Sequence, residues 1–99
     1  MPAEIIARRL KALADPARLR ILELLPDRNV CEDVYNVSEL ALELHLAQPT
    51  VSHHLRVLKT AGLVRSERMC RDVYYYVDKR ALDDLAGAVR ALKKPPAKR

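Results

Sequence analysis

The sequence contains no Phe and no Trp, and its aromatic side chains are limited to four Tyr. A core must therefore be built from Leu, Val, Ile and Ala, a mixture that suits packed helices. The chain has 99 residues, of which 49% are hydrophobic. This is enough for one compact domain and too little for two, and we expect residues 1–92 to form it.

Long apolar runs are also missing. No stretch approaches the length that spans a bilayer, and the N-terminus lacks the charged and then apolar layout of a secretory signal. We therefore expect a cytoplasmic protein with no membrane partner. In that compartment the two cysteines, Cys31 and Cys70, are expected to be thiols rather than a structural disulfide.

The residue patterns that mark enzymes are absent as well. The sequence shows no nucleophile with a paired base, no glycine-rich phosphate loop and no open metal site. An enzyme is therefore the function class that the sequence supports least.

The chain does carry an excess of positive charge, with 18 Lys and Arg against 13 Asp and Glu and a formal net charge of +5. This balance fits a polyanionic partner, although composition alone does not separate DNA, RNA, an acidic membrane surface and a merely solvated basic face. Residues 93–99 hold four basic residues, two prolines and no acid, which predicts a disordered basic tail.

Helical periodicity dominates the first part of the chain. Residues 3–14 place Ile6, Leu10 and Leu13 on one stripe of a helix. Asp15 is a typical N-cap residue followed by Pro16 at the first helical position, which predicts a second helix over residues 16–25.

The middle of the chain predicts two further helices. Residues 34–37 are expected to form a short strand, after which Ser38 is expected to cap a third helix that runs through Leu46. A fourth helix begins near Gln48 and ends where Gly62 permits a left-handed backbone.

After Gly62 the period of hydrophobic residues changes from helical to alternating. Residues 63–68 and 73–77 predict a hairpin, with Val73, Tyr75 and Val77 facing the core, and a last helix follows from about Asp78. The expected order is helix, helix, short strand, helix, helix, hairpin, helix. We therefore predict a mainly α fold with a small β-hairpin wing, a winged helix-turn-helix.

This arrangement points to double-stranded DNA. The apolar residues Val51, Leu55 and Leu58 would fix the fourth helix to the core and turn its polar side toward the major groove. Residues 50–72 contain five Lys or Arg and two acids, so positive charge gathers where contact is expected. The predicted DNA-binding residues are Gln48, Thr50, Ser52, His53, Arg56, Lys59, Arg65, Arg68 and Arg71. The alternatives are a solvated surface helix and a winged helix that binds protein.

Four segments carry a resemblance to a known family. The segments of residues 13–22 (LADPARLRIL), 48–58 (QPTVSHHLRVL) and 61–64 (AGLV) with 73–75 (VYY) resemble the ArsR/SmtB family of metal- and stress-responsive repressors. The resemblance covers nearly the whole chain, and residues 48–58 are its most specific part.

The resemblance implies a transcription regulator that binds an inverted-repeat operator as a homodimer and is released by an inducer. It places the first and last helices at the dimer interface. The apolar stripe of the last helix agrees, because its partner could be the same stripe across a two-fold axis. The predicted interface residues are Ile6, Leu10, Leu82, Leu85, Val89 and Leu92. The alternative is that they complete the core of a single chain.

The sensor sites of the family are not evident. Where relatives have the arsenite-type Cys-Val-Cys, this sequence has Asn36-Val37-Ser38, and the last helix offers Asp83 and Asp84 without a histidine, which makes a poor zinc site. His53 and His54 are adjacent and point roughly 100° apart on a helix, so they do not chelate one ion well.

Two thiols remain as candidate sensors. If Cys31 and Cys70 approach one another, thiol modification or a thiophilic metal or metalloid would be the signal, with Arg68 and Arg71 favouring a thiolate at Cys70. The alternative is that both are incidental thiols. A further departure is Ala47, which stands where relatives usually carry a Ser or Thr cap and would forgo roughly 1 kcal/mol of capping.

Overall fold

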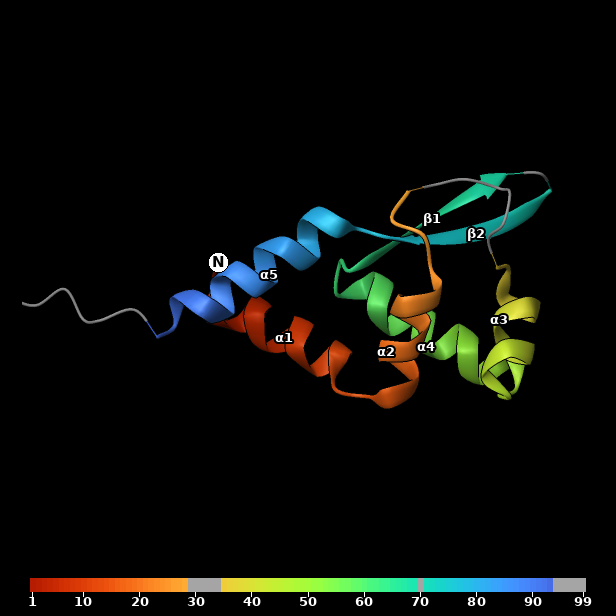
Figure 1. The fold of residues 1–99 in the computed structure, drawn as a ribbon, viewed down its shortest axis with the longest axis horizontal. Coiled ribbons are helices and arrows are strands. Elements are labelled where there is room, and N and C mark those ends of the chain that lie inside the picture. The colour runs from red at the N-terminus through yellow and green to blue at the C-terminus, as the bar shows by residue number, and fades with distance from the viewer. Residues whose placement is uncertain (29–34, 70, 94–99) are drawn as a thin grey trace, which may run out of the picture.

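The computed structural model describes residues 1–28, 35–69 and 71–93, and these residues form a helical protein with one hairpin (Figure 1). The elements, in chain order, are α1 (Ala3–Leu13), α2 (Pro16–Leu24), α3 (Val37–Leu44), α4 (Gln48–Thr60), β1 (Val64–Met69), β2 (Asp72–Val77) and α5 (Lys79–Ala91). The mainly α class and the hairpin wing agree with the sequence-based prediction. Cys31, Cys70, Val34 and residues 94–99 lie outside the described residues.

The junction between α1 and α2 forms as the sequence predicts. The Asp15 carboxylate accepts hydrogen bonds from the backbone N–H groups of Ala17 at 2.8 Å and Arg18 at 3.3 Å. Pro16 occupies the first turn, where a missing N–H costs nothing. Because these signals act within four residues, they determine the start of α2 without help from the rest of the fold.

The start of α3 corrects two predictions. Residues 35–37 form no strand, because Asn36 is the N-cap of α3 and Val37 is its first residue. The Asn36 side chain accepts from the Glu39 N–H, and the Glu39 carboxylate accepts from the Asn36 N–H, each at 2.9 Å. This capping box satisfies two backbone donors at once, so Ser38 lies inside the helix and is not the cap.

The turn into α4 is longer than the sequence suggested. Helix α3 ends at Leu44 rather than Leu46, because His45 adopts a left-handed conformation with φ of 56°. The Leu46 N–H then donates to the Ala41 carbonyl at 3.0 Å, which closes the end of the helix. The three residues His45, Leu46 and Ala47 form the turn of the helix-turn-helix.

The end of α4 is fixed by Gly62 and by Arg9 from α1. Gly62 has a φ of 81°, and a Cβ added there would lie 3.1 Å from the Arg9 guanidinium. The Arg9 Nε donates to the Ala61 carbonyl at 3.0 Å, so a cation satisfies a carbonyl at the negative end of the helix dipole. A side chain at residue 62 would therefore meet both backbone strain and crowding.

The hairpin is antiparallel, with Val64 opposite Val77 and Met69 opposite Asp72. Val77 is buried and Tyr75 packs against the core, as predicted, whereas Val73 is only half-buried and is not among the described residues that pack against the core. The Val77 N–H donates to the Pro26 carbonyl at 2.7 Å. Near the other end, the Asn36 amide donates to the Asp72 carboxylate at 2.9 Å and ties the hairpin to α3.

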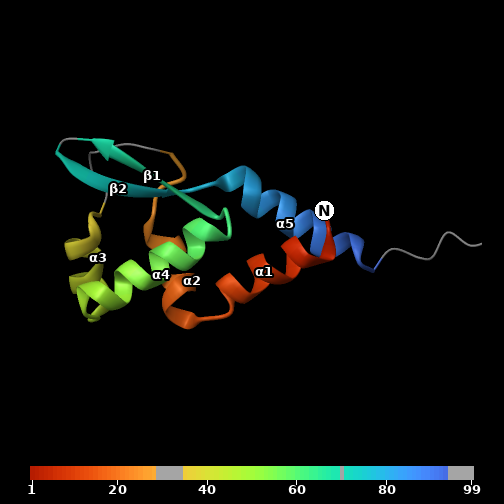
Figure 2. The same ribbon diagram turned by 180° about the vertical axis from the view of Figure 1, so that it is seen from behind.

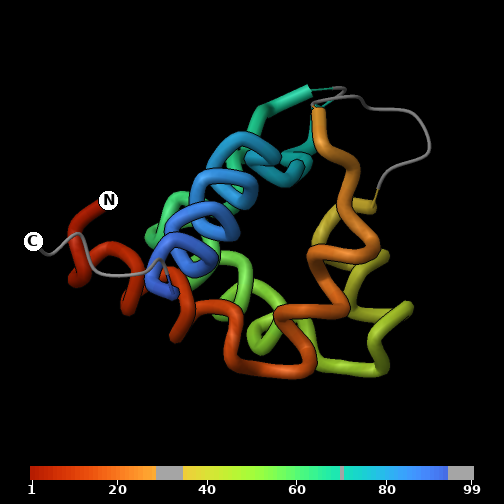
Figure 3. Tube along the Cα trace, turned by 60° about the vertical axis from the view of Figure 1, so that its left-hand side comes forward, coloured from red at the N-terminus to blue at the C-terminus, as the bar shows by residue number. Residues whose placement is uncertain are grey.

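The core lies where α2, α3 and α4 meet the base of the hairpin. Its fully buried side chains are Ile21, Leu40, Val51, Leu55, Leu58, Leu63 and Val64. Helices α1 and α5 lie side by side at the end of the molecule away from α3 (Figures 1 and 2), and Figure 3 shows the same separation from the side. Within residues 1–28, 35–69 and 71–93, no helix combines the length and the apolar character required to cross a membrane.

Candidate nucleic-acid interface

Helix α4 has one face fixed in the core. Val51, Leu55 and Leu58 are completely buried and recur at the spacing of one helical face. Full burial of each such side chain contributes about 1.5–3 kcal/mol, so the rotation of α4 about its axis is strongly determined. The remaining face is therefore turned outward as a rigid surface.

The outward face of α4 is polar and holds no carboxylate. Thr50, His53 and Arg56 are exposed and Ser52 is half-buried. The only charged side chains between Gln48 and Thr60 are Arg56 and Lys59. Such a face offers hydrogen-bond donors and acceptors to base edges without repelling phosphates.

Two of the predicted contact residues on α4 already have protein partners. The Gln48 amide donates to the Ser38 hydroxyl at 2.9 Å, and the Lys59 ammonium donates to the Ser66 hydroxyl at 2.7 Å. These bonds orient the first residue of α4 on α3 and the last turn of α4 on β1. Since both side chains are exposed, the Gln48 carbonyl oxygen and the other Lys59 protons remain available to a ligand.

The start of α4 lacks a side-chain cap. Ala47 occupies the N-cap with an extended backbone, and this helix start has no side-chain cap hydrogen bond among the described residues. The substitution that the sequence analysis singled out therefore leaves the N–H groups at this end of α4 without a capping side chain. An anion at this point would find both these donors and the positive end of the helix dipole.

The hairpin contributes three exposed arginines, of which Arg65 differs from the others. Its Nε donates to the Asp78 carboxylate at 2.9 Å. Hydrogen bonds from the Ala81 N–H and from Arg65 lower the pKa of Asp78, and the Asp78 hydrogen bond raises the pKa of Arg65. Arg68 and Arg71 form no ion pair within the described part of the chain, and Arg71 occupies the turn with a positive φ of 69°.

The predicted dimer residues divide into two groups. Ile6 and Leu85 are buried within the single chain, and Leu82 is half-buried against the same core. Leu10, Val89 and Leu92 are 42%, 37% and 65% exposed on the two helices that lie side by side. These three side chains are the predicted interface residues that remain exposed in the single chain.

The candidate sensor is not assembled within the described residues. Cys31 and Cys70 both lie outside them, and the described part of the chain contains no group of three or more His, Cys, Asp or Glu that could hold a metal. His53 and His54 have ring centroids 5.9 Å apart. His53 is exposed and His54 is half-buried, so the two imidazoles lie in different surroundings.

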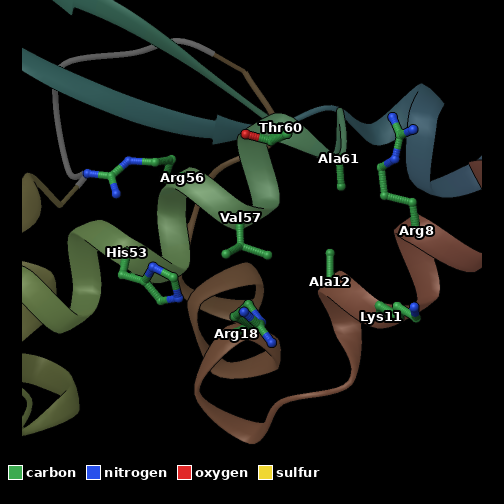
Figure 4. Close-up of a pocket in the computed structure, with 9 residues that line it drawn as sticks. All are labelled: Arg8, Lys11, Ala12, Arg18, His53, Arg56, Val57, Thr60 and Ala61. Carbon is green, nitrogen blue, oxygen red and sulfur yellow. The ribbon is translucent and has the colours of Figure 1, made fainter.

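The structure also reveals a feature that sequence reasoning missed. A hollow of about 450 Å³ lies between α4, α1 and α2, and Arg8, Lys11 and Arg18 line it together with residues of α4 (Figure 4). The three-residue spacing of Arg8 and Lys11 places them on one side of α1. Their meeting with α4 and α2 depends on tertiary packing, for which the sequence carries no local signal.

Comparison with known proteins places this arrangement among transcription regulators. The family model described as bacterial regulatory protein, arsR family, matches residues 15–66. An HTH-type transcriptional repressor SmtB of Mycobacterium tuberculosis is 46% identical over 66 residues, which are 67% of this chain and 45% of that protein. An HTH-type transcriptional regulator of Methanocaldococcus jannaschii is 42% identical over 68 residues, 68% of this chain and 71% of that protein.

Solved structures agree with the fold. The homodimeric winged helix-turn-helix DNA-binding domain of a possible ArsR-family regulator from Mycobacterium bovis has a TM-score of 0.69 and 30% identity, over 90% of this chain and 78% of that one. The chain spans about half the length of the first curated relatives that it matches. The winged helix-turn-helix is thus confirmed, and the chain belongs to the arsR family of bacterial regulatory proteins, a family of transcription regulators and not of enzymes.

Proposed function

We propose that the chain is a transcriptional repressor that binds an inverted-repeat DNA operator as a homodimer. The observation that carries the proposal is the two-sided character of α4, which buries Val51, Leu55 and Leu58 completely and exposes a polar face without carboxylates. A helix held in this way can enter the major groove and present the same face to every binding site.

The hairpin extends the surface. The Lys59–Ser66 hydrogen bond joins the end of α4 to β1, so the hairpin is held beside α4. The exposed guanidinium groups of Arg68 and Arg71 would neutralise phosphates next to the groove that α4 occupies. These cations would raise affinity for any duplex, whereas Ser52 and His53 would select the sequence.

The dimer rests on a different set of contacts. Leu10, Val89 and Leu92 leave an apolar surface on α1 and α5, and a two-fold axis through it would bury each side chain against its copy. Two copies of α4 would then meet two half-sites, which is why an inverted repeat is the expected operator. The homodimeric relative from Mycobacterium bovis supports this part of the proposal.

The inducer belongs to the proposal as well. Thiol modification, or a thiophilic metal or metalloid, at Cys31 and Cys70 is one route, and regulation without a thiol signal is the other. Replacement of both cysteines by Ser separates these routes. A thiol-dependent regulator would lose its response to the inducer, whereas a regulator without a thiol signal would not be affected.

The test is selection of bound DNA from random duplexes, followed by titration of the selected duplex. We expect a two-fold symmetric sequence, a 2:1 ratio of chain to duplex and a steep loss of affinity with salt. Enrichment of no sequence, together with binding that salt does not weaken, would instead favour a winged helix that binds protein.

A further inference from the structure

The hollow beside α4 has a floor and a rim of opposite character. Ala12 of α1, Val57 of α4 and Ala61 at the end of α4 point toward the same space (Figure 4). Arg8, Lys11 and Arg18 surround this apolar floor, and none of the described residues that line the hollow carries a carboxylate. An apolar floor with a cationic rim suits a molecule that has an apolar body and a negative charge.

Arg18 provides independent support because one of its donors has no hydrogen-bond partner among the described residues. Its side chain is only 15% exposed, and its buried Nε has no hydrogen-bond partner within the described residues. Its Nη2 lies 3.9 Å from the Asp15 carboxylate, whose other oxygen already caps α2. A mostly buried guanidinium normally satisfies its donors, so this arginine is short of an acceptor.

The other two cations of the rim differ from Arg18, because they have no such ion pair among the described residues. Arg8 and Lys11 are exposed and form no ion pair with any described residue. The volume of about 450 Å³ lies within the range of sites that hold small organic molecules. The hollow lies on α1 away from Leu10, so the expected dimer surface does not require it.

The position of the hollow links it to α4. His53 and Arg56 line its border and also belong to the exposed polar face of that helix. A molecule seated over Val57 would therefore occupy space next to the side chains that are expected to meet DNA. Its negative charge would also oppose the phosphates of an approaching duplex.

We propose that this hollow binds a small organic anion, a carboxylate or sulfonate carried on an apolar body, and that the bound anion competes with DNA. The binding of the anion is argued from the hollow alone. The competition with DNA rests on the proposed DNA-binding function. Arg18 would hold the anionic group, Arg8 and Lys11 would add to the attraction, and Ala12, Val57 and Ala61 would contact the apolar body.

The direct test is calorimetric titration of the free chain with naphthalene-1-sulfonate. Two control probes separate the contributions of its apolar body and its charge. Neutral naphthalene-1-sulfonamide keeps the apolar body, and inorganic sulfate keeps the charge. We expect one sulfonate per chain, with both control probes binding at least about tenfold more weakly. Equal binding of either control probe would overturn the proposed ligand class.

Substitutions locate the site. Arg18→Gln is expected to weaken sulfonate binding about tenfold, and the exposed double variant Arg8→Gln/Lys11→Gln is expected to weaken it severalfold. The double variant keeps the test valid if Arg18→Gln does not fold. Arg20→Gln, an exposed residue of α2 outside the hollow, is the matched control and should bind like the parent. Unchanged binding in the double variant would place the sulfonate elsewhere and overturn the proposal.

Competition is measured with the selected duplex. We expect naphthalene-1-sulfonate to displace the duplex at concentrations that fill the hollow, whereas the sulfonamide does not. If the sulfonate binds and no duplex does, the result would contradict the proposed DNA-binding function and leave the anion site in the hollow supported. Duplex binding that a bound sulfonate never weakens would overturn the competition with DNA and leave the anion site. If no sulfonate binds and duplex binding falls in the hollow variants, the hollow is a DNA contact and the anion site is overturned.

Discussion

The Arg65 guanidinium of the hairpin lies 2.9 Å from the Asp78 carboxylate, which also caps α5 by accepting from the Ala81 N–H at 3.0 Å. One carboxylate thus joins the hairpin, which is expected to meet DNA, to the helix that is expected to meet a second chain. Asp78 is mostly covered and Arg65 is mostly exposed, so the cap is the stronger of the two contacts.

Removal of this carboxylate should lower stability. Asp78→Ala loses the N-cap of α5 at a cost of about 1 kcal/mol, which corresponds to a fall in Tm of about 4–8 °C for a domain of this size. Thermal unfolding followed by circular dichroism measures the change. Asp83→Ala, an exposed site on the same helix, is the control and should leave the Tm unchanged. Equal Tm values for the two variants would mean that the cap contributes nothing.

The Asp78 carboxylate also makes the free energy of unfolding depend on pH, and the direction of this dependence is defined. Hydrogen bonds from the Ala81 N–H and Arg65 lower the pKa of folded Asp78 below its ordinary value of 3.8. A carboxyl group whose pKa is lower in the folded state stabilises the fold above the unfolded pKa, and this stability is lost as the pH falls through the folded pKa. We expect the free energy of unfolding to decrease on acidification below about pH 5, and the decrease to be smaller in Asp78→Ala. Parallel acid profiles of the parent and the variant would contradict this assignment.

Sequence reasoning succeeded where the deciding interactions are local. The Asp15-Pro16 start of α2 depends on a few neighbouring residues, and the left-handed backbone at the end of α4 depends on Gly62 itself; both are present. The prediction of a strand at residues 34–37 relied on β propensity. Asn36 and Glu39 instead form a capping box, which makes Val37 the first residue of a helix.

The hollow could not be found in this way, because it unites residues from three helices. The same limit applies to the apolar stripes of α1 and α5. Their spacing showed which residues share a face, but only the packed structure separates buried Ile6 and Leu85 from exposed Leu10 and Leu92. Solvent exposure depends on which elements cover a face, and helical periodicity does not contain that information.

Ala47 offers a stabilising change. Its extended backbone is already that of an N-cap residue, so Ala47→Ser should supply the missing side-chain acceptor and gain about 1 kcal/mol. We expect the Tm to rise by about 4–8 °C with no gain in DNA affinity. A variant with no increase in Tm would show that the first turn of α4 is satisfied by other means.

The dimer surface predicts a change of assembly. Leu92→Asp places a charge on a surface expected to be dry, and we expect the dissociation constant of the dimer to rise about a hundredfold or more. Sedimentation of the parent and the variant measures this constant. Leu42→Asp is the control, because Leu42 is even more exposed but lies on α3, away from α1 and α5. Loss of the dimer in Leu42→Asp alone would show that the interface lies on α3 instead.

The hairpin cations should act without regard to sequence. Arg71→Ala removes one phosphate contact, so it should weaken operator and unrelated duplexes alike and reduce the slope of log affinity against log salt by about 1. Titrations at several salt concentrations give that slope. An effect confined to the operator would mean that Arg71 contacts a base.

The role of the exposed face of α4 is decided by comparing the parent with His53→Ala on two duplexes of equal length, the selected operator and a scrambled sequence. His53 is exposed, so its removal leaves the core intact. We expect operator affinity to fall about tenfold while affinity for the scrambled duplex changes little. Equal affinities of the parent and the variant for the operator would show that this face of α4 does not read DNA.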